Sequence, residues 1–327
     1  MGGTAGRHVR VGYGWPVAAD TAAGADRPFC AEASAARDEP LGATASRIDH
    51  WVLVEYRRLW SRDLLAGSGL SDEVKGHLRA QLDALPRSRL LFVRRPDRRD
   101  HDGIAVFFGR SGERKGRFHG LELEDYEDLR ELDLAGALAD EAPAPPPLER
   151  PLLVVCTHGK RDRCCARYGR PLYDALRGRE DVGECVWQST HVGGDRFAGN
   201  LVCLPEGVYF GRVGPGDVDR IVDEYRAGRI APERYRGRAA YGFAAQAAEI
   251  RVREETGLRG LGDLALAAIE PLGDDGWAVR FRERATGATH EVEVRVELDP
   301  EPAFLTCEAG VPARPRRFVA RASRAAV

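Results

Sequence analysis

The chain has no apolar run that approaches the length a membrane-spanning helix requires, which is about eighteen residues. It also has no marked excess of charge of either sign. A formal net charge of −2 gives no reason to expect nucleic acid as a partner. The stretch from Val11 to Gly24 is interrupted by glycine, proline and aspartate, which argues against a signal peptide. With 43% hydrophobic and 31% charged residues, the composition is that of an ordinary globular protein, which we expect in the cytoplasm and away from membranes.

The cysteines cannot all be paired in disulfides within one chain, because there are seven of them. In the cytoplasm an adjacent pair such as Cys164 and Cys165 favours metal binding or redox chemistry over a structural disulfide. Cys30 precedes the first predicted strand and could be free and exposed. The remaining thiols that lie in or near predicted strands are expected to be small core side chains: Cys185, Cys203 and Cys307.

A length of 327 residues predicts two or three domains. After a loose tail at 1–27, the pattern of apolar residues predicts strand, helix, strand, strand, helix within a domain at 28–141. These elements are expected at 50–56, 71–85, 89–94, 103–109 and 123–140. Residues 142–148 are rich in proline and predict an extended linker.

The same order of elements follows the linker, within a domain at 149–236. Its elements are expected at 151–156, 166–177, 183–188, 200–213 (a hairpin) and 215–225. The repeated order predicts an α/β protein with two consecutive thioredoxin-like domains. Residues 237–327 predict a small α+β appendage, with one helix, an antiparallel meander and no ligand-like cluster.

Four side chains that can hold a metal lie within forty residues at two chain reversals, in the spacing Cys156-x8-Cys165-x25-His191-x3-Asp195. Cys156 ends a predicted strand, and Cys165 lies at the start of the next helix, where the helix dipole favours a thiolate. Gly193 and Gly194 separate the other two and allow a tight turn around a bound group. Two thiolates, an imidazole and a carboxylate indicate iron or zinc chemistry, with Cys164 and His158 as further candidate ligands.

The segment from Cys156 to about residue 230 resembles the thioredoxin-like [2Fe-2S] ferredoxins and, more closely, the sucrase/ferredoxin-like family. The resemblance rests on Cys165-Ala-Arg-Tyr-Gly169, on the hairpin Pro205-Glu-Gly-Val-Tyr-Phe210 and on the helix that follows. It implies a [2Fe-2S] cluster and one-electron transfer or redox sensing with a redox partner protein, more than conversion of a substrate. The family pattern His-x-Gly-Gly-His appears here with aspartate at its last position, Asp195.

Two other functions stay open at this point. A thiol-dependent redox enzyme would use Cys164 or Cys165 as its nucleophile, although the chain lacks Cys-x-x-Cys at the strand–helix junction. A zinc-binding module without redox activity would use the same four ligands, although a carboxylate is unusual in a purely structural zinc site.

Overall fold

The computed structural model describes residues 27–95, 102–114 and 116–326. The tail expected at 1–27 therefore lies outside the described residues, except for Arg27. Within the described ranges, no helix is both long and apolar enough to cross a lipid bilayer.

The first thioredoxin-like unit follows a short helix, α1 (Cys30–Ala36), that the sequence did not predict. In this unit β1 pairs in parallel with β2 and antiparallel with β3. The helix α2 begins where the Ser71 side chain accepts a hydrogen bond from the Val74 N–H, and it buries Val74 and Leu78. The elements of the unit are β1 (His50–Glu55), α2 (Asp72–Asp83), β2 (Ser88–Arg94), β3 (Ile104–Arg110), β4 (Arg117–Leu123), the 3-10 helix η1 (Tyr126–Glu131) and α3 (Leu134–Leu138).

The second unit repeats this pairing, because β5 is parallel to β6 and antiparallel to β7. Its elements are β5 (Leu152–Cys156), α4 (Arg163–Arg177), η2 (Gly183–Cys185), β6 (Val186–Ser189), η3 (Asp195–Phe197), β7 (Leu201–Leu204), β8 (Val208–Phe210), η4 (Pro215–Asp217), α5 (Val218–Arg226), η5 (Pro232–Arg234) and β9 (Tyr235–Arg238). The helix α5 buries the predicted stripe of Val218, Ile221, Val222 and Tyr225.

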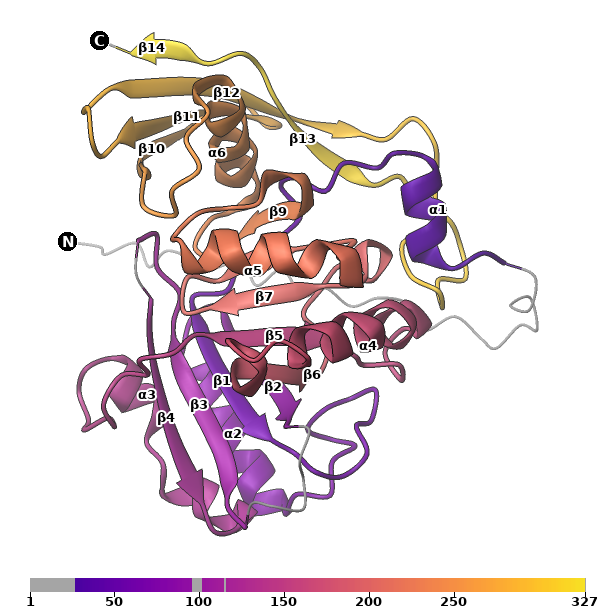
Figure 1. The fold of residues 1–327 in the computed structure, drawn as a ribbon, viewed down its shortest axis with the longest axis vertical. Helices are drawn as coiled ribbons and strands as arrows, with labels where there is room; N and C mark the ends of the chain where they lie inside the picture. Colours follow the sequence, from indigo (N-terminus) through magenta and orange to yellow (C-terminus); the bar gives the residue numbers. More distant parts are fainter. Residues whose placement is uncertain (1–26, 96–101, 115, 327) are drawn as a thin grey trace, which may run out of the picture.

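The two units form one nine-stranded sheet in the order β4-β3-β1-β2-β6-β5-β7-β8-β9 (Figure 1). They join where Val93 and Arg94 of β2 pair antiparallel with Ser189 and Gln188 of β6. Alternate residues of β1 and β5 face different clusters, as the period of a strand requires. Val52 and Val54 pack in the cluster that includes α2 and α3, while Leu153 and Val155 pack in the cluster that includes α4 and α5.

A third cluster joins the two units. It contains Trp51 and Leu53 of β1 together with Val154 and Cys156 of β5. The Phe107 and Trp187 rings, one from each unit, meet edge to face at 5.0 Å between centroids. The sheet is thus curled around a shared core, and the predicted pair of thioredoxin-like units is confirmed. The predicted domain boundaries stay predictions. The predicted linker lies against β4, where the Leu148 N–H donates to the Phe118 carbonyl.

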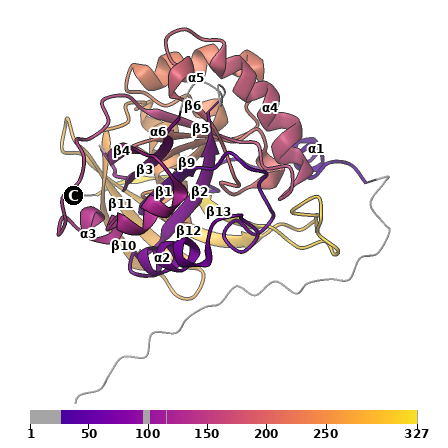
Figure 2. The same ribbon diagram turned by 90° about the horizontal axis from the view of Figure 1, so that it is seen from below.

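The α+β appendage is also confirmed. The helix α6 (Phe243–Thr256) packs on a separate antiparallel sheet (Figure 1; seen from below in Figure 2). The strands of this sheet are β10 (Leu264–Pro271), β11 (Gly276–Glu283), β12 (Thr289–Leu298), β13 (Arg316–Ala320) and β14 (Arg324–Ala326).

Four strands were not predicted from the sequence, namely β4, β9, β13 and β14, and two predicted elements differ from the structure. The acidic helix expected at 123–140 is split into η1 and α3, because Asp125 and Asp133 each cap a separate short helix and Leu132 between them is extended. The strand expected at 183–188 begins with the 3-10 turn η2, so that β6 starts only at Val186.

Candidate metal centre

Three predicted ligands, Cys156, Cys165 and His191, come together with their donor atoms all within 4.8 Å of one another. Asp195 lies beside them: its Oδ1 is 3.0 Å from His191 Nδ1 and accepts a hydrogen bond from the Cys165 thiol at 3.3 Å. Asp195 is not one of the three donors that lie within this distance of one another, but it contacts two of them. The four side chains therefore lie at one place, at the C-terminal end of β5, the first turn of α4 and the loop after β6.

Close packing of α4 on the end of β5 places Cys165 against Cys156. The helix begins at Asp162, whose carboxylate accepts a hydrogen bond from the Cys164 N–H, and Cys165 follows in the first turn. One turn later the helix passes over the β5 backbone at Gly169. A Cβ atom built there would lie 2.0 Å from the carbonyl oxygen of Cys156. Only glycine permits this approach, which accounts for the Gly169 of the predicted motif.

The loop that carries His191 and Asp195 needs its two glycines. Gly193 and Gly194 have φ angles of 101° and 82°, a left-handed conformation that residues with a Cβ seldom adopt. The structure also holds the carbonyl groups of this loop. Arg89 donates to the His191 carbonyl at 3.2 Å, and Tyr209 donates to the Val192 carbonyl at 3.3 Å.

Arg236 is the main anchor of the loop and was not predicted from the sequence. Its guanidinium, 1% exposed, donates to the Gly193 carbonyl at 3.0 Å and to Asn200 Oδ1 at 2.7 Å. The Asn200 amide in turn donates to the Gly194 carbonyl at 2.8 Å. Burial lowers the pKa of Arg236 to about 10, a value at which the side chain is still charged at neutral pH. No local motif marks Arg236, because it reaches the site from β9, on the far edge of the sheet order.

The two thiols and the imidazole of the site have pKa values shifted from their ordinary values. The hydrogen bond with Cys165, aided by His191, holds the pKa of the Cys156 thiol well below its usual value despite burial. The same bond, together with burial, raises the pKa of Cys165 well above the usual value. Burial opposes a charge on His191, but hydrogen bonds with Asp195 and Cys156 raise its pKa to about 9. The two thiols of the site therefore differ in acidity, with Cys156 the more acidic of the pair.

The two further candidates, His158 and Cys164, lie elsewhere. His158 Nε2 bonds the Ser61 carbonyl at 3.0 Å, its ring meets Trp60 edge to face, and its buried Nδ1 has no hydrogen-bond partner in the part of the chain that the structure describes. Cys164 lies in a different cluster from Cys156 and Cys165, with Cys30 and Cys307.

Two expectations about the other thiols were wrong. Cys30 is a free thiol, as expected, but it is buried at 3% exposure, and Cys307 of the appendage belongs to a group of ligand-type side chains with Cys30, Asp162 and Cys164. Both were missed because their partners lie more than a hundred residues away along the chain. Cys185 and Cys203 are buried, as expected.

Comparison with known proteins identifies the family. The model of the sucrase/ferredoxin-like family matches residues 41–237, which is more than half of the chain. The chain belongs to the sucrase/ferredoxin-like family. The match covers both thioredoxin-like units and ends within β9, so that the appendage lies beyond it.

Among curated relatives of this sucrase/ferredoxin-like protein are two called Altered inheritance of mitochondria protein 32. The one from Meyerozyma guilliermondii is 41% identical over 95 residues, which are 26% of this chain and 34% of the relative. The one from Eremothecium gossypii is 33% identical over 104 residues, 28% of this chain and 33% of the relative. The chain thus spans about a third of the length of these relatives.

Solved structures similar to the chain include a thioredoxin-like [2Fe-2S] ferredoxin from Aquifex aeolicus. It is 21% identical, with a TM-score of 0.24, and the match covers 27% of this chain and 91% of that one. A cysteine-to-serine variant of that ferredoxin matches at 21% identity with a TM-score of 0.23, over 26% of this chain and 97% of that chain.

Proposed function

We propose that this protein holds a [2Fe-2S] cluster on Cys156, Cys165, His191 and Asp195 and uses it for one-electron transfer or redox sensing. The observation that supports the proposal most is the donor set: two buried thiols, an imidazole and a buried carboxylate meet at the end of β5. Thiolate and imidazole are the ligands that such clusters take in proteins. When bound, the cluster accepts and releases one electron.

The residues around the donors keep the site in position and largely dry. Cys156 and Cys165 are 1% and 0% exposed, and the Asp195 side chain is 6% exposed. Asp195 orients the His191 ring through its bond to Nδ1, while Arg236 and Asn200 hold the loop that carries both. A site held from several elements in this way changes little in shape when its charge changes, which favours electron transfer over conversion of a substrate.

His191 offers the route for electrons, because its side chain is 20% exposed whereas the other donors are nearly covered. The exposed Lys160 and Arg161 lie in the loop that joins Cys156 to α4, and Arg161 acts on the Asp195 carboxylate through its charge. We expect the partner to be a redox protein with an acidic surface in the cytoplasm. An anionic small-molecule oxidant should react with the reduced protein faster than a cationic one of similar potential. The difference should shrink with added salt and in Arg161→Glu.

The decisive experiment uses the full chain purified without oxygen. We expect a reddish-brown protein with iron and acid-labile sulfide in equal amounts and visible absorption that dithionite bleaches. Cys165→Ala should lose iron and sulfide together. Cys203→Ala, which removes an equally buried thiol outside both groups of ligand-type side chains, should keep them. A colourless protein that carries zinc at this site, or a metal-free protein whose thiols react rapidly with peroxide, would refute the proposal and favour the zinc module or the thiol enzyme.

A further inference from the structure

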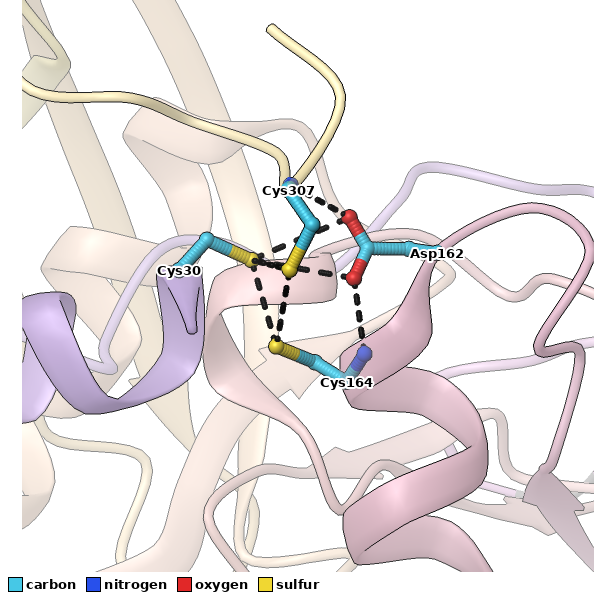
Figure 3. Close-up of side chains that lie close together, drawn as sticks. All are labelled: Cys30, Asp162, Cys164 and Cys307. Atoms are coloured by element: carbon cyan, nitrogen blue, oxygen red, sulfur yellow. Dashed lines mark hydrogen bonds between the residues drawn. The ribbon is translucent and has the colours of Figure 1, made fainter. Parts of the chain in front are cut away.

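Three thiols from distant parts of the chain meet beside the start of α4. Cys30 opens α1, Cys164 lies in the first turn of α4, and Cys307 lies in the loop between β12 and β13. Their sulfur atoms form a triangle: 3.5 Å from Cys30 to Cys164, 3.3 Å from Cys164 to Cys307 and 3.7 Å from Cys307 to Cys30 (Figure 3). All three are buried, and none is in a disulfide.

Asp162 completes the group with a carboxylate that is 0% exposed. Its Oδ1 accepts a hydrogen bond from the Cys164 N–H at 2.8 Å, and its Oδ2 accepts one from the Cys307 N–H at 2.7 Å. Both oxygens lie 3.8 Å from the Cys30 sulfur (Figure 3). Among the described residues, no basic side chain forms an ion pair with Asp162. A buried carboxylate without a cation is costly, and a bound metal ion would supply the missing positive charge.

The spacing fits a single tetrahedral ion. With zinc–sulfur bonds of about 2.3 Å, neighbouring sulfurs around a tetrahedral Zn²⁺ lie about 3.8 Å apart. The three observed separations are only slightly shorter, and all four donor atoms lie within 4.8 Å of one another. A disulfide would join only two of these sulfurs and would leave the third thiol unpaired beside Asp162.

We propose that Cys30, Cys164, Cys307 and Asp162 form a second metal site that binds one Zn²⁺ ion. On binding, the three thiols release their protons to solvent and bind as thiolates, so that the ion and its ligands carry a net charge of −2. The Ala31 N–H, 3.5 Å from the Cys164 sulfur, and the N–H groups on Asp162 compensate part of this charge. No oxidation or reduction is involved.

The zinc ion would hold α1 and the loop between β12 and β13 together on the first turn of α4. The surroundings of Cys307 are already arranged for this contact. Arg27 donates to the Ala309 carbonyl at 2.8 Å, and its guanidinium lies 4.0 Å from the centre of the Phe304 ring. Figure 1 shows α1 beside the loop that precedes β13. Because Cys164 and Cys165 are neighbours, the zinc site would fix the helix turn that presents Cys165 to the candidate cluster site.

The test measures zinc and iron separately in the full chain, produced with both metals in the medium. We expect one zinc per chain in the wild type, loss of zinc with retained iron in Cys307→Ala, and loss of iron with retained zinc in Cys165→Ala. Cys185→Ala, a buried thiol outside both groups, should keep both metals. Asp162→Asn should weaken zinc binding by about 10-fold or more.

A measurement on Cys165→Ala, which keeps the four proposed zinc ligands, keeps the test decisive if Cys307→Ala does not fold. After reduction and removal of metal from this variant, added Co²⁺ should give the charge-transfer bands of three thiolate ligands and the intense visible bands of tetrahedral cobalt. Zinc that is retained in Cys307→Ala, zinc that is lost only in Cys165→Ala, or absence of both zinc and cobalt binding would overturn the proposal. So would a disulfide between two of these cysteines in the freshly purified protein, detected by mass spectrometry after alkylation.

Discussion

Replacement of Gly169 by alanine tests the geometry of the candidate cluster site without touching a ligand. The added Cβ would lie 2.0 Å from the Cys156 carbonyl oxygen, whereas real Cβ contacts are essentially never closer than 3.0 Å. The neighbour is backbone in a fully buried strand, so it cannot rotate away. Helix α4 must therefore move by about 1 Å or more away from β5. This shift would carry Cys165 away from Cys156.

We expect Gly169→Ala to lower the free energy of unfolding by about 1–3 kcal/mol, the usual cost of overpacking a core. The cost is lower than the clash alone would give, because alanine is the better helix former by about 1 kcal/mol. We also expect a lower content of iron and sulfide, since a displaced ligand weakens cluster binding. The assays are urea unfolding followed by circular dichroism, and iron and sulfide per chain.

The matched control is Gly76→Ala in α2, another glycine inside a helix, where an added Cβ meets nothing within 4 Å. It should raise the free energy of unfolding by about 0.5–1 kcal/mol and leave the iron content unchanged. If Gly169→Ala is as stable as this control and binds as much iron, the close approach of α4 to β5 does not position the ligands, and the reasoning is wrong.

Three other predictions address the loop, the fourth ligand and the appendage. Arg236→Met leaves the Gly193 carbonyl without its buried donor, so we expect it to cost about 3 kcal/mol in urea unfolding; a cost below about 1 kcal/mol would contradict this anchoring role. Asp195→His removes a negative charge from the proposed cluster site, so its reduction potential should rise in a redox titration; an unchanged or lower potential would show that Asp195 is not a ligand. Glu249 is buried between Arg238 and Arg253, and Glu249→Gln should cost about 3–5 kcal/mol. Burial opposes its charge, but the two arginines hold the pKa of Glu249 below its ordinary value of 4.5; its contribution is therefore complete above pH 4.5 and is lost as the pH falls below it. Acid unfolding of the wild type beside Glu249→Gln measures this, and identical profiles would contradict it.

Two neighbouring residues of α4, Cys164 and Cys165, would each bind a different metal centre. Cys165 faces the shared core and the candidate cluster site, while Cys164 faces α1 and the loop between β12 and β13 that carries Cys307. An adjacent pair in the first turn of a helix can do this because successive side chains point about 100° apart around the helix axis. The Cys164-Cys165 pair is thus suited to two separate sites more than to one disulfide.

The local pattern of the sequence was sufficient to predict the two thioredoxin-like units and the appendage. The unbroken apolar run of β5 and the periods of apolar residues in α5 and the β10–β12 meander are set by which faces of each element are buried, and this information is local. The same holds for the spacing of Cys156, Cys165, His191 and Asp195, because each follows a strand or opens a helix within one unit. Asp125 and Asp133 show the limit of such prediction: their role as caps overrode the helical pattern around them.

Contacts between side chains that are distant along the chain could not be predicted from the sequence and became visible in the fold. Arg236 reaches the glycine loop from β9, and Cys30 and Cys307 meet Cys164 from the two ends of the described chain. No periodicity encodes these contacts, since they depend on how the sheet curls and on where the appendage packs. Most of the helices and strands and four candidate ligands could be predicted from the sequence alone. The fold decided that the seven thiols are divided between a candidate cluster site, a separate triangle of sulfurs and the core, because burial brings together residues that the chain keeps apart.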